Sequence, residues 1–263
     1  VVDGLDMGLA RAIGSVGVIG GGTMGQGIVR CFLAAGLPVI LVERDQDSLA
    51  NAVSAVRASL DAAVEKGRLV PDEAARRKAA FTGATDFAAL SGCDLAIEAV
   101  FEDMAIKRDV LGRLERVLAA DAMLATNTSY LDIDAMAEGV AHKGRVVGLH
   151  FFSPADVMPL IEVVRAHATD DATLATALKL ARKLGKQPVV ARVAEGFIGN
   201  RIYAAYRRRA ELLVLDGATP QQVDRAAIAF GFAMGPFAVA DMSGLDIAWA
   251  MRKRQAPTRD PAA

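Results

Sequence analysis

Residues 15–45 read SVGVIGGGTMGQGIVRCFLAAGLPVILVERD, and this stretch decides the fold. Its apolar run at residues 16–19 predicts a buried strand and is followed by glycines spaced G-x-G-x-x-G. A helical pattern over residues 23–35 ends at Gly36, and a second apolar run, residues 39–42, ends on Glu43. Strand, glycine turn, helix, strand and acid in this order indicate a unit that binds a dinucleotide.

Each glycine has its own physical role in such a turn. Gly20 permits the tight turn, Gly22 lets a pyrophosphate approach the backbone, and Gly25 lets the helix pack closely against the strand. The phosphates would lie on free N–H groups at the helix N-terminus, which begins with Thr23 and Met24. We expect a nicotinamide or flavin dinucleotide here; a glycine-rich turn without a ligand is the alternative.

The acid that ends the second strand bears on which dinucleotide is preferred. Glu43 lies 23 residues after Gly20, near the expected ~20, and can accept hydrogen bonds from both ribose hydroxyls. It would repel the extra phosphate of NADP, so we expect NAD. Arg44 is the counter-argument, because its guanidinium could reach that phosphate.

Composition and charge exclude several classes of function. The 263 residues are 53% hydrophobic and carry a formal net charge of -1, which gives no electrostatic basis for binding nucleic acid or an anionic membrane. No apolar run reaches the ~18 residues of a membrane span, and the first residues lack the apolar core of a signal peptide. Cys31 and Cys93 lie in apolar sequence, which is typical of buried thiols in a reducing compartment; a catalytic cysteine is the alternative. We expect a soluble intracellular enzyme.

Strand and helix patterns alternate through most of the chain. Further strands are predicted at residues 81–84, 95–100, 123–126, 145–152, 160–164 and 189–193, and helices at 47–66, 71–80, 103–119 and 173–184. This alternation predicts an α/β fold with a doubly wound, mostly parallel Rossmann-type sheet that binds ligands at the carboxyl ends of its strands. The helices within residues 47–80 should form an antiparallel hairpin with Lys66 and Arg68 at its basic tip.

Only helical patterns follow the last strand, at residues 197–215, 220–230 and 236–254. We therefore expect two domains, a dinucleotide-binding domain at residues 1–192 and an all-helical domain at residues 193–263. Residues 1–14 are interpreted as a lead-in to the first domain.

One of the three histidines stands out. His142 and His167 lie in polar loops, whereas His150 ends an apolar strand at the edge where such sheets bind ligands. Glu162 lies inside another apolar strand and needs a partner, because burying an isolated carboxylate is costly. An imidazole held by a carboxylate suits proton abstraction. A histidine satisfied within the core is the alternative, and Ser129 and Asn200 are weaker candidates because both residue types are common helix caps.

Six blocks of sequence resemble the 3-hydroxyacyl-CoA dehydrogenases, especially the form fused to an enoyl-CoA hydratase in multifunctional β-oxidation proteins. These blocks are GVIGGGTMGQGI, EAVFEDMAIKRDV, ATNTSYLDI, GLHFFSPADVMPLIEVV, EGFIGNRI and GPFAVADMSGLDIAWAMRKR, and the resemblance covers residues 15–254. It implies NAD-dependent oxidation of (3S)-3-hydroxyacyl-CoA to 3-ketoacyl-CoA.

The resemblance implies a role for each matching residue. His150 would be the catalytic base and Glu162 its partner, Ser129 would bind the 3-hydroxyl oxygen, and Asn200 would help to hold the substrate. The cofactor would lie against Gly20, Gly22, Thr23, Met24, Gly25, Glu43, Glu102, Lys107 and Asn127. CoA would contact Ser59, Lys66 and Ser153, although many members have Asn where this chain has Ser153. No metal site is implied.

Three other functions fit the sequence less well. A hydroxy-acid or sugar-acid dehydrogenase usually carries a catalytic lysine in the helical domain, and EGFIGNRI has none. A structural or sensor protein would not need Ser129, His150, Glu162 and Asn200 together. A methyltransferase fits the HFFSP and NTS blocks poorly.

The resemblance also suggests a setting for the chain. The helical region is shorter than in relatives, so we expect a fragment of a multifunctional protein, with a hydratase part before residue 1 and a second helical repeat after residue 263. Apolar faces left uncovered favour self-association. The expected compartment is the cytoplasm of a bacterium, or the peroxisome or mitochondrial matrix of a eukaryote.

Overall fold

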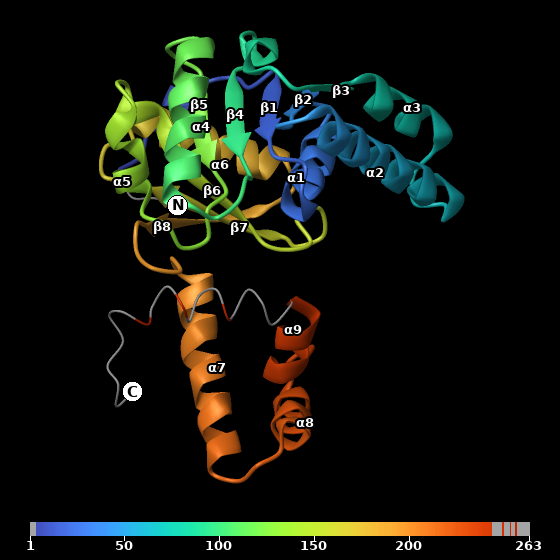
Figure 1. Cartoon of the computed structure of the whole chain (residues 1–263), viewed down its shortest axis with the longest axis vertical. Coiled ribbons are helices and arrows are strands. Elements are labelled where there is room, and N and C mark those ends of the chain that lie inside the picture. Colours follow the sequence, from blue (N-terminus) through green and yellow to red (C-terminus); the bar gives the residue numbers. More distant parts are fainter. Residues whose placement is uncertain (1–3, 244–248, 250–252, 254–255, 257–263) are drawn as a thin grey trace. The chain divides into compact units, whose positions relative to one another are not determined.

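The computed structural model describes residues 4–243 together with residues 249, 253 and 256. Contacts divide the chain into two compact units, residues 1–198 and residues 199–263. The first unit contains a sheet with helices on both faces, and the described part of the second contains helices (Figure 1).

Eight strands of the first unit form one sheet in the order β3-β2-β1-β4-β5-β6-β7-β8. Their bounds are β1 Val16–Ile19, β2 Val39–Val42, β3 Phe81–Ala84, β4 Leu95–Glu98, β5 Met123–Thr126, β6 Val146–Phe151, β7 Leu160–Arg165 and β8 Gln187–Arg192. Neighbouring strands run parallel except β6 and β7, which pair antiparallel. The predicted Rossmann-type, mostly parallel sheet is confirmed.

Helices bury both faces of this sheet, because alternate residues of each strand point to opposite sides. One face packs against α1 (Thr23–Ala34), α2 (Gln46–Glu65) and α6 (Asp171–Lys183). The other packs against α4 (Met104–Val117), α5 (Ile133–Met136) and the 3-10 helix η2 (Phe87–Leu90). Leu95 and Ile97 of β4 belong to the first core, whereas Ala96 between them belongs to the second.

The expected helical hairpin is present, and α2 packs against α3 (Pro71–Ala79). In Figure 1 the two helices extend away from the sheet beside β2 and β3. Asp45 caps α2, since its side chain accepts a hydrogen bond from the amide of Ser48. Lys66 and Arg68 are exposed in the turn between the two helices.

The lead-in is part of the first unit. Residues Met7–Leu9 form the 3-10 helix η1, which packs against α6, and Leu5 and Ile13 pack against the core. The amide of Arg11 donates to Thr176 Oγ1 at 2.9 Å, and Arg11 Nη2 donates to Thr173 Oγ1 at 3.1 Å.

The second unit begins with α7 (Gly199–Leu215), followed by α8 (Pro220–Phe230) and α9 (Pro236–Ser243). Thr219 and Gln222 form a capping box that starts α8, and Gly231 ends it with a φ of 118°. The last predicted helix continued to residue 254, and most of that continuation lies outside the described residues.

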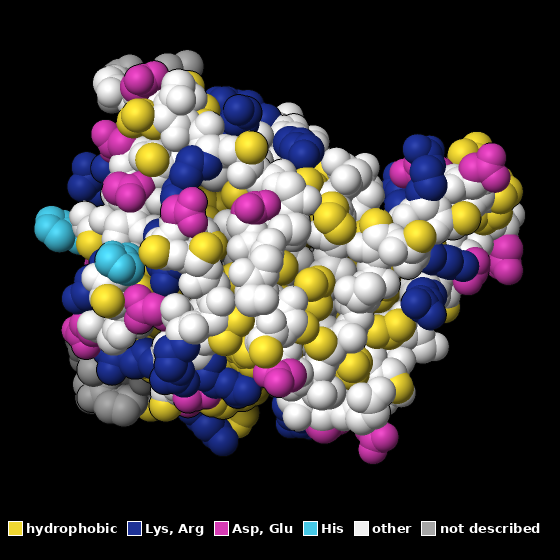
Figure 2. All heavy atoms as spheres, turned by 90° about the horizontal axis from the view of Figure 1, so that it is seen from above, with side chains coloured by type: hydrophobic (Ala, Val, Ile, Leu, Met, Phe, Trp, Pro, Cys, Tyr) yellow, Lys and Arg dark blue, Asp and Glu magenta, His cyan; other side chains and the backbone are white. Residues whose placement is uncertain are grey.

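The surface agrees with the nearly balanced charge. Acidic and basic side chains are interspersed over the face shown in Figure 2. Among the described residues, no helix is both long and apolar enough to cross a membrane. Cys31 and Cys93 are buried, and burial raises the pKa of each thiol to about 11.

Candidate active site

The antiparallel pairing of β6 and β7 sets His150 directly opposite Glu162. His150 Nδ1 lies 2.7 Å from Glu162 Oε2, and the two side chains are 4% and 1% exposed. A carboxylate at Nδ1 favours the tautomer with its proton there, which leaves Nε2 as the basic nitrogen. The other two histidines, His142 and His167, are exposed.

Aromatic rings and a backbone amide complete the surroundings of this pair. The rings of Phe152 and Phe197 lie 4.6 Å and 5.6 Å from the imidazole, both tilted. Glu162 Oε1 accepts a hydrogen bond from the amide of Ile198 at 3.0 Å. Both carboxylate oxygens are therefore engaged, so the carboxylate holds the ring in one orientation.

The glycine turn between β1 and α1 fits a dinucleotide. Gly20 has a φ of 94°, and a Cβ on Gly25 would lie 1.8 Å from the carbonyl oxygen of Gly20. Apart from its neighbours along the chain, a Cβ on Gly22 would have no protein atom within 4 Å, so space for a pyrophosphate is open there. Gly22 is the N-cap of α1 and no side chain caps this helix, whose first residues are Thr23 and Met24.

Glu43 reaches the same turn from the end of β2. Its Oε1 accepts from the amide of Gly21 at 2.6 Å, and its Oε2 accepts from the amide of Arg44 at 3.0 Å. Backbone amides therefore hold the carboxylate at the glycine turn, and its contact with an adenosine ribose stays a prediction.

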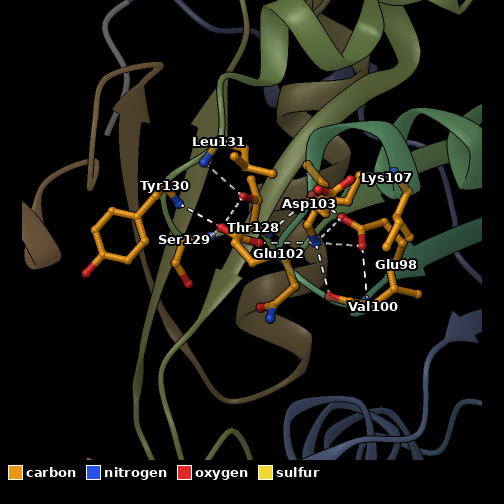
Figure 3. A network of polar contacts seen from close by, with 12 residues as sticks. Glu98, Val100, Glu102, Asp103, Lys107, Thr128, Ser129, Tyr130 and Leu131 are labelled. Atoms are coloured by element: carbon orange, nitrogen blue, oxygen red, sulfur yellow. Dashed lines mark hydrogen bonds and ion pairs between the residues drawn. The ribbon is translucent and has the colours of Figure 1, made fainter. Parts of the chain in front are cut away.

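A buried ion pair lies at the carboxyl end of β4, next to β1 and β5 (Figure 3). Lys107 Nζ of α4 lies 2.9 Å and 2.8 Å from the two oxygens of Glu98, and the side chains are 1% and 0% exposed. The Thr126 hydroxyl also donates to Glu98. Burial raises the pKa of Glu98 despite the charge of Lys107 and these hydrogen bonds.

Glu102 connects this ion pair to the loop that follows β5 (Figure 3). Its Oε2 lies 3.3 Å from Lys107 Nζ. Its Oε1 accepts from the Thr128 hydroxyl at 2.6 Å and from the amides of Ser129 and Tyr130 at 2.9 Å and 3.1 Å. Burial acts to raise the pKa of Glu102, but Lys107 and these donors outweigh it, so the pKa is lowered. Glu102 therefore fixes the backbone around Ser129.

The sequence patterns do not single out Glu98 or Phe197. A signal for Glu98 was present, since it is an acid that ends an apolar strand nine residues before Lys107. Phe197 has no such signal beyond its place in EGFIGNRI, because its φ of 46° depends on tertiary packing.

The remaining candidates lie in several elements. Asn127 directly follows β5, and its Oδ1 accepts from the amide of Phe151 at 2.9 Å, which fixes the end of β6. Ser153 is exposed after β6, Ser59 lies half-buried on α2, and Asn200 lies in the first turn of α7, in the second unit. For Ser59, Lys66, Ser153 and Asn200, a place at the substrate stays a prediction.

Family models match both units of this chain. Residues 15–194 match the 3-hydroxyacyl-CoA dehydrogenase NAD binding domain, and residues 196–263 match the C-terminal domain of the same family. The chain belongs to the 3-hydroxyacyl-CoA dehydrogenase family. Its glycine turn and Glu43 are thus part of an NAD-binding domain.

Relatives and solved structures of family members are similar over most of the chain. The peroxisomal bifunctional enzyme of Homo sapiens is 41% identical over 249 residues, which are 95% of this chain and 34% of that protein. The chain thus spans about a third of the length of such curated relatives. The (S)-3-hydroxybutyryl-CoA dehydrogenase of Ralstonia eutropha is 32% identical with a TM-score of 0.89, covering 95% of this chain and 89% of that one. The dehydrogenase part of multifunctional enzyme 1 from C. elegans is 30% identical with a TM-score of 0.68, covering 94% and 57%.

Proposed function

We propose that this chain oxidises (3S)-3-hydroxyacyl-CoA to 3-ketoacyl-CoA with NAD, as a step of fatty acid β-oxidation. The observation that carries the proposal is the buried pair of His150 and Glu162 in a chain of the 3-hydroxyacyl-CoA dehydrogenase family. A buried imidazole with one nitrogen fixed by a carboxylate is suited to accept a proton at the other.

His150 acts as the general base in this reaction. Its Nε2 takes the proton of the 3-hydroxyl group, and Glu162 stabilises the imidazolium that forms. Bound NAD supplies the acceptor for the hydride that leaves C3. The O–H proton thus passes to the histidine as the C3–H hydride leaves, and the 3-keto group forms.

Ser129 and its loop position the oxygen of the substrate. The amide of Ser129 is tied to Glu102, which leaves the serine hydroxyl available for the 3-oxygen. In the reverse direction, Ser129 and protonated His150 polarise the 3-keto group. We further propose that Asn200 helps to hold the substrate, that Ser59, Lys66 and Ser153 contact CoA, and that the cofactor lies against Glu102, Lys107 and Asn127.

The setting of the chain is also a proposal. Relatives named bifunctional or multifunctional enzymes support fusion or association with an enoyl-CoA hydratase part. The compartment would be the one in which fatty acyl-CoA is oxidised, which is the cytoplasm of a bacterium or the peroxisome or mitochondrial matrix of a eukaryote.

A spectrophotometric assay tests the proposed reaction. Purified protein with NADH and acetoacetyl-CoA should consume NADH, followed by its absorbance. His150→Gln should lower turnover by ~10²–10⁴-fold, since general-base catalysis contributes that much. Binding of NADH, measured by fluorescence, should change little. His142→Gln is the control, because that histidine is exposed. Wild-type turnover in His150→Gln would overturn the role of His150, and an inactive wild-type protein that binds NADH would overturn the substrate class.

A further inference from the structure

Phe197 has an unusual backbone conformation next to the proposed catalytic pair. Its φ is 46°. Among the described residues other than glycine, Phe197 alone has a positive φ. A residue with a side chain adopts this left-handed region at a cost in free energy, and such strain persists only where the surroundings enforce it. Gly196 before it also has a positive φ, 69°, so two successive left-handed residues form this turn.

The turn at Phe197 carries two contacts to the pair. The next amide, that of Ile198, donates to Glu162 Oε1 at 3.0 Å. The Phe197 ring is buried, with 2% of the residue exposed, and lies 5.6 Å from the imidazole of His150. One residue therefore touches the histidine with its side chain and directs a donor at the carboxylate with its backbone.

We propose that Phe197 is a positioning residue for the proposed dehydrogenase reaction. Its left-handed backbone directs the Ile198 amide at the oxygen of Glu162 that His150 does not use, and its buried ring holds the turn in place. Rotation of the Glu162 side chain would break its contact with His150 Nδ1. Fixing the orientation of the carboxylate therefore also fixes the orientation of the imidazole. A glycine would allow the same angle but would lack the buried ring that holds the turn in place.

Two substitutions separate the backbone angle from simple loss of the ring. Leu and Val are both apolar and lack the ring, but Val is branched at Cβ and is a strong outlier at a positive φ. We expect kcat to fall at least about tenfold more in Phe197→Val than in Phe197→Leu, with KM for NADH within about twofold of wild type in both. Equal kcat in the two variants would overturn the proposal.

A double-mutant cycle tests whether Phe197 acts through Glu162. In a Glu162→Gln background, Phe197→Val should cause only a small further loss of kcat. If the fold-loss of kcat in the double variant equals the product of the fold-losses in the two single variants, Phe197 does not act through Glu162. Phe87→Leu is the control for loss of a buried ring elsewhere, since Phe87 is 7% exposed and packs under Arg113. It should leave kcat unchanged.

Amide hydrogen exchange does not depend on turnover, so it tests the positioning role of Phe197 independently of the proposed reaction. The Ile198 amide should be protected from hydrogen exchange in wild-type protein and in Phe87→Leu, and should exchange faster in Phe197→Val. Protection that is unchanged in Phe197→Val would overturn the positioning role even if the chain is an active dehydrogenase. Faster exchange would support the role even if acetoacetyl-CoA is not a substrate.

Discussion

At the scale of single residues, Glu43 and Arg44 are the side chains expected to bear on the choice between NAD and NADP. Glu43 lies at the glycine turn, 2.6 Å from the amide of Gly21. Arg44 instead pairs with Asp45 at 3.0 Å, and its side chain is 84% exposed. Glu43 is therefore held at the turn by backbone amides, whereas Arg44 is held only by a surface ion pair.

We predict that the catalytic efficiency, kcat/KM, is at least about tenfold higher with NADH than with NADPH, because like charges placed together disfavour the wrong ligand. Glu43→Ala should narrow this preference by lowering the efficiency with NADH. Steady-state kinetics with both cofactors measure the effect, and equal efficiency with NADPH would contradict it.

At the scale of elements, the loop after β5 depends on one carboxylate of the β4–α4 connection. Glu102 accepts hydrogen bonds from Thr128, Ser129 and Tyr130, and its pKa is lowered. Ionised Glu102 therefore stabilises the fold at a pH above its unfolded pKa of about 4.3, and this contribution is lost as the pH falls through the lower folded value.

We predict that Glu102→Gln lowers the free energy of unfolding by about 1–2 kcal/mol at pH 7, as expected for hydrogen bonds to a partly screened charge. The difference from wild type should shrink below pH 4. Urea unfolding at pH 7 and at a pH below 4 measures this difference in the free energy of unfolding. Glu138→Gln is the control, because Glu138 is exposed. A difference that does not depend on pH would show that the charge of Glu102 is unimportant.

The sequence predicts where the strands and helices lie along the chain better than it predicts the direction of each strand in the sheet. The apolar run at residues 160–164 predicts the strand that carries Glu162, and burial of a carboxylate there requires a partner. Its direction was not predictable, because an apolar run looks the same in either direction along a sheet. The antiparallel pairing nevertheless determines that His150 and Glu162 lie opposite each other. Likewise, propensity gives no reason to expect a left-handed Phe197, since tertiary packing overrides it there.

At the scale of the whole molecule, the helical unit exposes several large apolar side chains. Leu215 is 81% exposed and Phe230 is 84% exposed, and Leu213 and Ile228 are more than half exposed. Exposed apolar groups of this size favour association with other apolar surfaces.

We predict that the isolated chain self-associates through these helices. Sedimentation over a range of concentrations should show a species larger than the monomer. The double variant Leu215→Ser, Phe230→Ser should contain less of this species. Val157→Ser is the control, because Val157 is an exposed residue of the first unit. It should not change the amount of the larger species. A monomer at all concentrations would contradict the prediction.

The ion pair of Glu98 and Lys107 limits how this protein can change by mutation. Loss of Lys107 alone leaves the buried Glu98 without a charged partner, which costs about 3–5 kcal/mol of a total stability of about 5–15 kcal/mol. Replacing both partners with apolar residues of similar volume is often neutral. A deep mutational scan should therefore detect epistasis: Lys107→Met alone should reduce abundance, and adding Glu98→Leu should recover part of the loss. Recovery should be incomplete, because Glu102 also loses its contact with Lys107. A lineage that carries this pair is thus expected to keep or lose both residues together, although they lie nine positions apart in the sequence.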